Sequence, residues 1–335
     1  PVLSVVIPCY NEEDCLFELH RRVTAAASAA AGESYEIVLV NDGSRDASWQ
    51  VMTEIARGDP RLVAINLSRN HGHQLALTAG LDLCSGERIL IIDADLQDPP
   101  ELLSDMIARM DAEGADVVYA VRRARAGETA FKRGTAKLFY RLLTRLADID
   151  IPLDTGDFRL LSPRALDVLR QLRERHRFMK GLFGWVGFEQ VAIPYQRDAR
   201  LAGASKFNFW RLWNFALEGI TSFSTAPLRL ATYLGVATAL LAFVYAVWIV
   251  LKALFWGDPV AGWPTMMSVI LLLGGVQLVA LGLIGEYLGR LYVESKQRPL
   301  YVVESWRPGG VCSGQSPGEG DGHAHGAAVA GGQGA

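Results

Sequence analysis

The chain has 335 residues, of which 50% are apolar and 21% charged, and its 33 basic and 36 acidic residues leave a net charge of −3. This balance excludes a nucleic-acid binder held by excess positive charge, so no nucleic acid is expected as a partner. The four cysteines show no C-x-x-C spacing, which excludes a zinc cage or a disulfide framework and favours a reducing compartment.

The first 160 or so residues alternate short apolar runs with amphipathic stretches. The predicted strands are Leu3–Ile7, Glu36–Val40, Leu62–Leu67, Arg88–Ile92 and Asp116–Val121, and the clearest predicted helices are Asp14–Ala31 and Ala47–Arg57. This order predicts an α/β fold with a Rossmann-like, mostly parallel sheet covered by helices on both faces. Ligands of such sheets bind beyond the carboxyl ends of the strands.

Carboxylates follow two of these predicted strands. Asn41–Asp46 (NDGSRD) follows the second strand and Asp93–Pro100 (DADLQDPP) follows the fourth. Acids gathered at one sheet edge repel each other unless a cation lies among them, and Mg²⁺ held by carboxylates and substrate phosphates suits this arrangement. We therefore expect Asp93 and Asp95 near a metal ion and a nucleotide diphosphate, with Asp42 accepting from the base or ribose.

The sequence lacks the motifs of two other classes of nucleotide-binding protein. No G-x-G-x-x-G follows the first strand and no G-x-x-x-x-G-K-[ST] occurs, which argues against a dinucleotide dehydrogenase and a P-loop NTPase. His71 and His73 are interpreted as caps of the third helix, because neither has metal-ligand spacing to a second cluster.

Basic residues gather in Val121–Arg145, where Arg133, Lys137, Arg141 and Arg145 recur every four residues. A basic amphipathic helix beside anionic lipid fits this pattern, and so does a solvated helix face. Farther on, Gly203–Lys206 precedes the aromatic run Phe207–Trp213, which is typical of a membrane interface.

Two later stretches are nearly free of charge. Leu230–Leu251 and Pro259–Gly285 are each long enough to cross the ~30 Å hydrocarbon core as a helix. Basic residues flank the outer ends of this pair, which under the positive-inside rule places both termini in the cytoplasm. The predicted segments are a cytoplasmic catalytic domain (1–206), an amphipathic interface segment (207–227), two transmembrane helices (228–254 and 265–290) joined by a short extracytoplasmic loop (255–264), a cytoplasmic C-terminal segment (291–306) and a disordered tail (307–335).

Four motifs in order resemble those of the family-2 inverting glycosyltransferases of GT-A fold. They are Ile7–Glu13 (IPCYNEE), Val40–Ser44 (VNDGS), Asp93–Pro100 (DADLQDPP) and Gly156–Leu160 (GDFRL). With Met179–Phe183, Trp213–Ile220 and the paired spans, the chain is most similar to polyprenyl-phosphate glycosyltransferases, the group that contains dolichol-phosphate mannose synthase and the bactoprenol glucosyltransferases. The resemblance covers about residues 1–305.

The resemblance implies roles for particular residues. Nucleotide binding falls to Pro8, Tyr10, Glu12, Asp42 and Asp93; metal binding, with Mg²⁺ or Mn²⁺, to Asp93 and Asp95; catalysis to Asp157 and Asp95; and acceptor-phosphate binding to Arg200, Ser205 and Lys206, to which the basic segment adds Arg122 and Arg125. Orienting the acceptor, sharing the metal or pairing with Arg159 are alternative roles for Asp157. Cys9 stands where valine or alanine is more usual in the family, and Phe207 where tyrosine or tryptophan is common.

The implied activity is transfer of one hexose from a UDP-sugar, with UDP-glucose as the first choice, to undecaprenyl or another polyprenyl phosphate for cell-envelope glycan modification. The enzyme is expected in the inner membrane as a multi-pass protein. GDP-mannose, UDP-galactose and UDP-GlcNAc remain alternative donors, and a non-catalytic membrane scaffold is an alternative function. A processive synthase is disfavoured because Gln171–His176 lacks Q-x-x-R-W. Small-xxx-small spacing at Gly285–Gly289 predicts a homo-oligomer, with a tetramer among the options.

Overall fold

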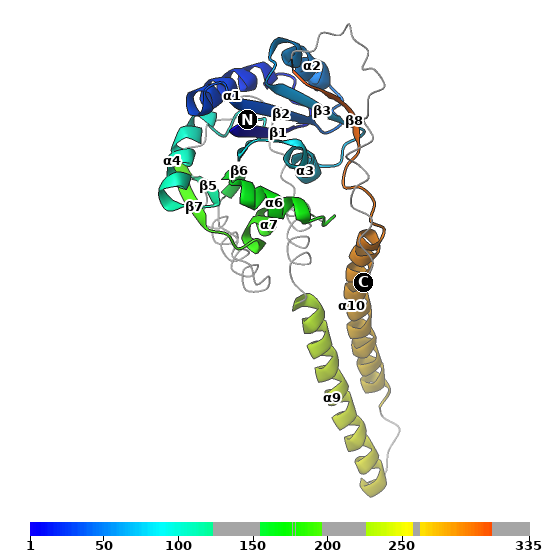
Figure 1. Ribbon diagram of the computed structural model, residues 1–335. Helices are drawn as coiled ribbons and strands as arrows, with labels where there is room; N and C mark the ends of the chain where they lie inside the picture. Colours follow the sequence, from blue (N-terminus) through cyan, green and yellow to red (C-terminus); the bar gives the residue numbers. More distant parts are fainter. Residues whose placement is uncertain (123–154, 176, 178, 196–225, 257–261, 310–335) are drawn as a thin grey trace, which may run out of the picture.

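The computed structural model describes residues 1–122, 155–175, 177, 179–195, 226–256 and 262–309. They form an α/β domain and a long helical hairpin (Figure 1). The strands are β1 (Leu3–Cys9), β2 (Tyr35–Asn41), β3 (Leu62–Leu67), β4 (Arg88–Ile91), β5 (Val117–Arg122), β6 (Thr155–Leu161), β7 (Gln190–Tyr195) and β8 (Val303–Arg307). The helices are α1 (Leu16–Ala31), α2 (Ser48–Gly58), α3 (His73–Leu83), the 3-10 turn η1 (Pro100–Leu102), α4 (Leu103–Glu113), α6 (Pro163–Gln171), α7 (Met179–Trp185), α9 (Ala226–Trp256) and α10 (Trp263–Ser295).

All eight strands join one sheet in the order β7-β5-β6-β4-β1-β2-β3-β8. The pairs β1–β2, β1–β4, β2–β3 and β5–β7 are parallel, whereas β6 runs antiparallel to both β4 and β5 and β8 runs antiparallel to β3. The five predicted strands and the α/β class are confirmed, and the sheet is mixed. The sequence did not indicate that β6 and β8 run antiparallel to their neighbours in the sheet.

Apolar side chains on both sides of the strands explain why helices cover both faces. Leu3, Val5 and Ile7 of β1 pack with apolar residues of α1, α2 and α4. Val6 faces the other way and packs with α3, α6 and α7. The close approach of α3 depends on Gly80, where a Cβ would lie 2.3 Å from a methyl carbon of Val6. The second half of α3 is thereby held close against β1 and β2.

The C-terminal segment returns to the sheet. The sequence predicts a short apolar strand at Leu300–Glu304 that pairs either with a neighbouring chain or with its own domain. The structure has β8 at Val303–Arg307, and this strand pairs with β3 of the same chain. Ser68 N–H also donates to the carbonyl of Val302 over 2.9 Å. The residues after α10 therefore complete the sheet of the α/β domain.

The helices α9 and α10 lie side by side and extend away from the α/β domain (Figure 1). Among the described residues, one helical segment, Leu272–Ser295 of α10, is long and apolar enough to cross a membrane. None of its most apolar part is buried inside the protein. Ala231–Tyr245 of α9 is a shorter apolar stretch. The predicted interface segment, apart from its last two residues, and nearly all of the predicted tail lie outside the described residues.

Candidate active site

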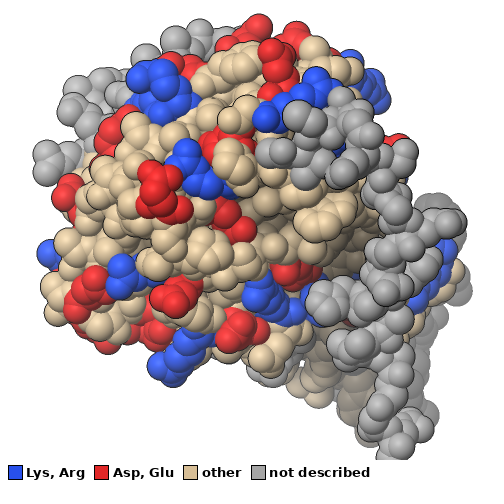
Figure 2. Space-filling model, turned by 45° about the horizontal axis from the view of Figure 1, so that its top comes forward, with Lys and Arg blue, Asp and Glu red and all other residues tan. Residues whose placement is uncertain are grey.

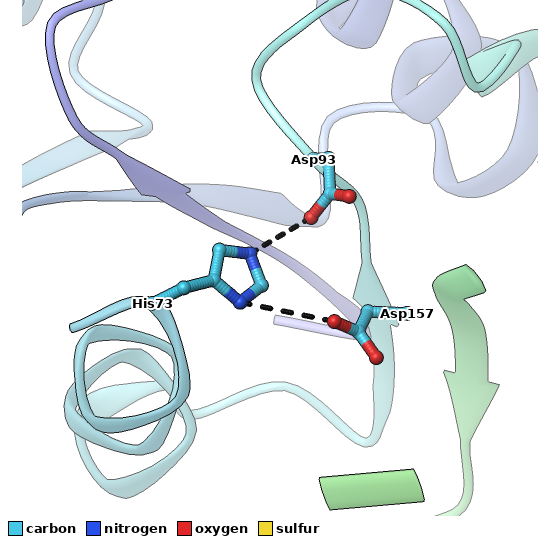
Figure 3. Close-up of side chains that lie close together, drawn as sticks. All are labelled: His73, Asp93 and Asp157. Carbon is cyan, nitrogen blue, oxygen red and sulfur yellow. Dashed lines mark hydrogen bonds and ion pairs between the residues drawn. The ribbon is translucent and has the colours of Figure 1, made fainter. Parts of the chain in front are cut away.

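Three polar side chains from separate parts of the chain meet at one edge of the sheet. His73 Nε2 lies 3.0 Å from Asp93 Oδ1, and His73 Nδ1 lies 3.7 Å from Asp157 Oδ2. Figure 3 shows the imidazole ring between the two carboxylates. One donor atom from each residue lies within 4.8 Å of the others. The site therefore combines two of the predicted acids with a histidine.

Sheet topology explains this meeting. Asp93 follows β4, whose residue Ile91 is level with Arg159 of the antiparallel strand β6. Continuing this register by two residues puts Asp93 level with Asp157, near the start of β6. His73 is the first residue of α3, which follows β3. Because parallel β3 and β4 end where antiparallel β6 begins, all three residues reach the same edge.

From the sequence, His73 was interpreted as a cap of the third helix, and that interpretation was wrong. The N-cap of α3 is Gly72, and no side chain caps the helix. Burial lowers the pKa of His73, but the hydrogen bond to Asp93 and the charges of Asp93, Asp157 and Asp42 outweigh it and raise the pKa overall. The raised pKa of His73 therefore favours the protonated ring, whose charge would balance part of the negative charge at this edge when no cation is bound.

Asp42 supports the loop ahead of α3. Its carboxylate accepts from the backbone N–H groups of His71 (2.7 Å) and Gly72 (2.9 Å), and only 2% of the residue is exposed. Burial raises the pKa of Asp42 and outweighs these two hydrogen bonds. The adjoining Gly43 has φ +63, and a Cβ there would lie 2.5 Å from the backbone of Arg69. The two loops therefore need glycine at this contact.

The loop after β1 lies against the same edge. Tyr10 is 40% exposed, so its ring is open to a ligand, whereas Pro8 is buried. Cys15 Sγ lies 3.2 Å from both Glu12 Oε2 and the carbonyl of Ala94, and so links the first motif to the Asp93–Pro100 motif. Burial raises the pKa of Cys15 to about 12. This thiol stays protonated and is a structural link.

Cys9 is also inert. It is 2% exposed, and burial raises the pKa of its thiol well above the usual value. The departure from the family pattern at this position therefore places a small, protonated side chain in the core.

A buried arginine lies behind Asp157. Arg159 is two residues farther along β6 and is completely buried. Its guanidinium carbon lies 4.3 Å from the centre of the Phe183 ring and 5.7 Å from that of Tyr119. Burial lowers the pKa of Arg159 to about 10, although the charges of Asp157 and Tyr119 act in the opposite direction. Arg159 therefore stays positive at neutral pH and offsets part of the negative charge of Asp157.

The predicted acceptor side of the site begins at the same edge. The neighbouring parallel strands β5 and β7 end there at Arg122 and Tyr195, which are paired in register. The Tyr195 hydroxyl donates to Asp98 Oδ1, so β7 ends against the Asp93–Pro100 loop. The side chain of Arg122, the whole of Arg125, Arg200, Ser205 and Lys206, and the predicted basic helix lie outside the described residues.

The residues present fit a divalent cation. Carboxylate oxygens suit Mg²⁺ and Mn²⁺, and an imidazole nitrogen is a donor that Mn²⁺ also accepts. Among the described residues, Asp157 Oδ1 is buried and has no hydrogen-bond partner, so it is oriented for a ligand. Asp95 stands outside the group of three, and its Oδ1 accepts from Gln97 N–H over 3.2 Å. Its assignment as a metal ligand remains a prediction.

The surface of the described residues shown in Figure 2 has no large patch of one charge that would indicate a second binding site. Figure 2 shows Lys and Arg side chains interspersed with Asp and Glu over that face of the described residues. This matches the net charge of −3 and contrasts with the group of acids at the carboxyl edge.

Comparison with known proteins agrees with this arrangement. Residues 4–170 match the family model "Glycosyl transferase family 2", and residues 226–291 match "GtrB C-terminal hairpin". The chain is 48% identical over 301 residues to an uncharacterized glycosyltransferase of Synechocystis sp., covering 90% of this chain and 94% of that one. It is 44% identical over 303 residues to the bactoprenol glucosyl transferase of Shigella phage SfV, covering 90% and 98%.

A weaker likeness exists to a solved structure. A mannosyltransferase from Pyrobaculum calidifontis superposes with a TM-score of 0.46 at 17% identity, covering 89% of this chain and 87% of that one. This likeness carries no argument about the donor or the metal. The identities of 44–48% over nine-tenths of the chain do decide the family. The chain belongs to glycosyl transferase family 2.

Proposed function

We propose that the protein transfers one hexose from a nucleotide sugar, with UDP-glucose as the first choice, to undecaprenyl phosphate or another polyprenyl phosphate. The observation that carries this proposal is the group His73, Asp93 and Asp157 at the carboxyl edge, together with the motif residue Asp42. The 44% identity to a bactoprenol glucosyl transferase supports glucose and a polyprenyl acceptor.

The reaction is a single displacement. A phosphate oxygen of the lipid attacks the anomeric carbon while the bond from that carbon to the nucleotide diphosphate breaks, which inverts the configuration. A bound divalent cation would neutralise charge on the diphosphate as it leaves. Asp93 and Asp95 would hold the cation, and His73 would either join them or keep the carboxylates together.

Asp157 does not have to remove a proton from this acceptor. A phosphate monoester, with a second pKa near ~6, is already largely ionised at neutral pH. A strong general base is therefore unnecessary, and orientation of the acceptor or a share of the cation suits Asp157 better. Arg159 behind it keeps a positive charge beneath the carboxylate.

The acceptor would arrive from the membrane side. β5 and β7 lead at this edge into the segments that carry Arg125 and Arg200, Ser205 and Lys206. Such cations suit an anionic lipid phosphate. We also infer a membrane hairpin of two spans with both termini cytoplasmic, supported by the lengths of α9 (31 residues) and α10 (33 residues). A homo-oligomer stays a prediction.

The test is transfer by membranes that contain the protein. Membranes are incubated with labelled UDP-glucose, UDP-galactose, UDP-GlcNAc or GDP-mannose, and the lipid product is extracted. We expect labelled lipid with UDP-glucose and its loss in Asp95→Asn. The control Asp105→Asn removes an exposed acid on α4 and should keep activity. Absence of labelled lipid with every donor would overturn the proposal, and product from another sugar would correct the donor.

A further inference from the structure

The strand that follows the membrane hairpin is joined to the two loops of the predicted donor site by a continuous set of hydrogen bonds. Asn66 Nδ2 of β3 donates to Glu304 Oε2 of β8 over 2.7 Å, and Asn41 Nδ2 of β2 donates to Asn66 Oδ1 over 2.6 Å. Ser44 N–H donates to Asn41 Oδ1 over 3.2 Å, and Asn11 N–H donates to Ser44 Oγ over 3.0 Å. We call these bonds the cross-strand relay.

The relay has one direction, which is set at one end by the acceptor Glu304 and at the other by the donor Ser44 N–H. An ionised carboxylate only accepts, so the amide of Asn66 must turn its NH₂ group toward Glu304 and its oxygen toward Asn41. Asn41 in turn must present its NH₂ group to Asn66 and its oxygen to Ser44 N–H. A charge at one end of such a chain also polarises the bonds that follow. Ser44 N–H, which can only donate, favours the same orientation from the other end, so without Glu304 the relay keeps its direction but loses its charged acceptor, and Asn66 loses the partner of its NH₂ group.

The far end of the relay reaches the residues expected at the nucleotide. Asn41 immediately precedes Asp42, and Asn11 immediately follows Tyr10. Asn11 has φ 55, an uncommon conformation for a residue with a side chain, and its Oδ1 accepts from Arg45 N–H over 2.8 Å. These bonds therefore define how the first two motif loops lie against each other.

Other contacts of the segment after α10 reach the end of β3 and helix α3, which lead to and carry His73. Ser68 N–H, just before the loop that leads to His73, donates to the carbonyl of Val302. The hydroxyl of Tyr301 donates to Asp82 of α3 over 2.9 Å. The residues after α10 thus hold β3, the following loop and α3 together.

We propose that Glu304 is a positioning residue of the donor site, and that the segment after the membrane hairpin is thereby part of nucleotide binding. The proposal rests on the proposed function, because it takes the loops of Tyr10 and Asp42 as the nucleotide site. Glu304 is exposed and borders a pocket of about 300 Å³ together with Asn41 and Asn66, so the relay is accessible to solvent. Water replaces part of a lost bond, so the effect is moderate.

The experiment uses the full chain in detergent and three variants. Glu304→Ala removes the acceptor, Glu304→Gln keeps an acceptor oxygen but loses the charge, and Arg307→Ala removes an exposed charge from the same strand outside the relay. Each protein is titrated with UDP or GDP in the presence of Mg²⁺ or Mn²⁺. Donor KM and kcat are measured, and hydrogen exchange of residues 41–48 is followed without nucleotide.

We expect Glu304→Ala to weaken UDP binding by about three- to tenfold. It should raise donor KM by a similar factor with kcat unchanged, since a ground-state contact is lost. Exchange in 41–48 should rise, Glu304→Gln should fall between the wild type and Glu304→Ala, and Arg307→Ala should match the wild type. A merely structural role would lower the unfolding temperature without splitting KM from kcat.

Equal UDP affinity and equal exchange in Glu304→Ala and Arg307→Ala would overturn the proposal. If Glu304→Ala does not fold, Glu304→Gln decides by the same two measurements. If the wild-type protein binds neither UDP nor GDP, the proposed function fails while the exchange measurement still tests the relay. The two failures are therefore distinguishable.

Discussion

Buried acids at the amino-terminal edge and at the carboxyl edge of the sheet differ in how their charge is balanced. At the amino-terminal edge, ahead of β3, Asp59 is 6% exposed and is contacted from two sides, by Arg61 Nε at 3.2 Å and by His20 Nε2 at 2.9 Å. Burial raises the pKa of Asp59, but hydrogen bonds from the Arg61 backbone, His20 and the Arg61 side chain outweigh it and lower the pKa overall. Its charge is balanced within the fold.

At the carboxyl edge, Asp42 is 2% exposed and both its oxygens accept from backbone N–H groups. There burial prevails, and the pKa of Asp42 is raised. Asp93 and Asp157 share one histidine between them. The difference teaches that burial alone does not mark a functional acid. The mark is a buried acid whose charge the fold leaves for a ligand to balance.

The sharpest way to break this comparison is to neutralise one acid at each edge. Asp93→Asn removes a charge and a predicted cation ligand, so transfer should fall by at least about 10²-fold, or about 2.7 kcal/mol in the barrier. Its unfolding temperature should change little. Asp59→Asn should keep the rate per folded molecule. Lipid product and calorimetry measure the two, and equal loss of activity in both variants would contradict the comparison.

A second way compares the two histidines. His73→Gln should lower the affinity for Mn²⁺, measured by electron paramagnetic resonance without any nucleotide, by about tenfold. His20→Gln, at the other edge, should bind Mn²⁺ like the wild type, because His20 contacts Asp59 and Thr24 and belongs to no part of the His73–Asp93–Asp157 group. Unchanged Mn²⁺ binding in His73→Gln would remove His73 from the cation site.

The smallest effect concerns stability at the amino-terminal edge. Asp59→Asn should cost about 1 kcal/mol, since Arg61 and His20 are partly exposed, and lower the unfolding temperature by about 2 to 4 °C. Because the folded-state pKa of Asp59 is lowered, its contribution is present above the unfolded pKa near ~3.9 and disappears as the pH falls through the folded value. The difference from wild type should therefore narrow between about pH 5 and pH 3.

Much of the carboxyl edge of the sheet could be predicted from the sequence. Alternating apolar runs located the first five strands, and the acids after two of them predicted where Asp42, Asp93 and Asp95 lie. His73 was missed because its contacts join residues 20 and more positions apart, and no local pattern reports them. The available signal was position: His73 follows the third parallel strand, whose carboxyl end meets the same edge.

The pairing of the two reversed strands, β6 and β8, could not be predicted for a related reason. β6 and β8 each pair with strands made much earlier in the chain, and the cross-strand relay joins Asn66 to Glu304 over 238 positions. Such pairing depends on which strand at the side of the sheet still lacks a partner, and this is decided only by the assembled fold.

The position of β8 also dictates the order in which the protein can be built. The chain leaves the sheet after β7, forms α9 and α10, and only then supplies the last strand. During synthesis, β3 is thus an open edge until both helices have emerged, and open edges invite wrong pairing. Closing that edge late ties completion of the sheet to synthesis of α9 and α10, so a chain halted before residue 303 leaves β3 open to wrong pairing and aggregation.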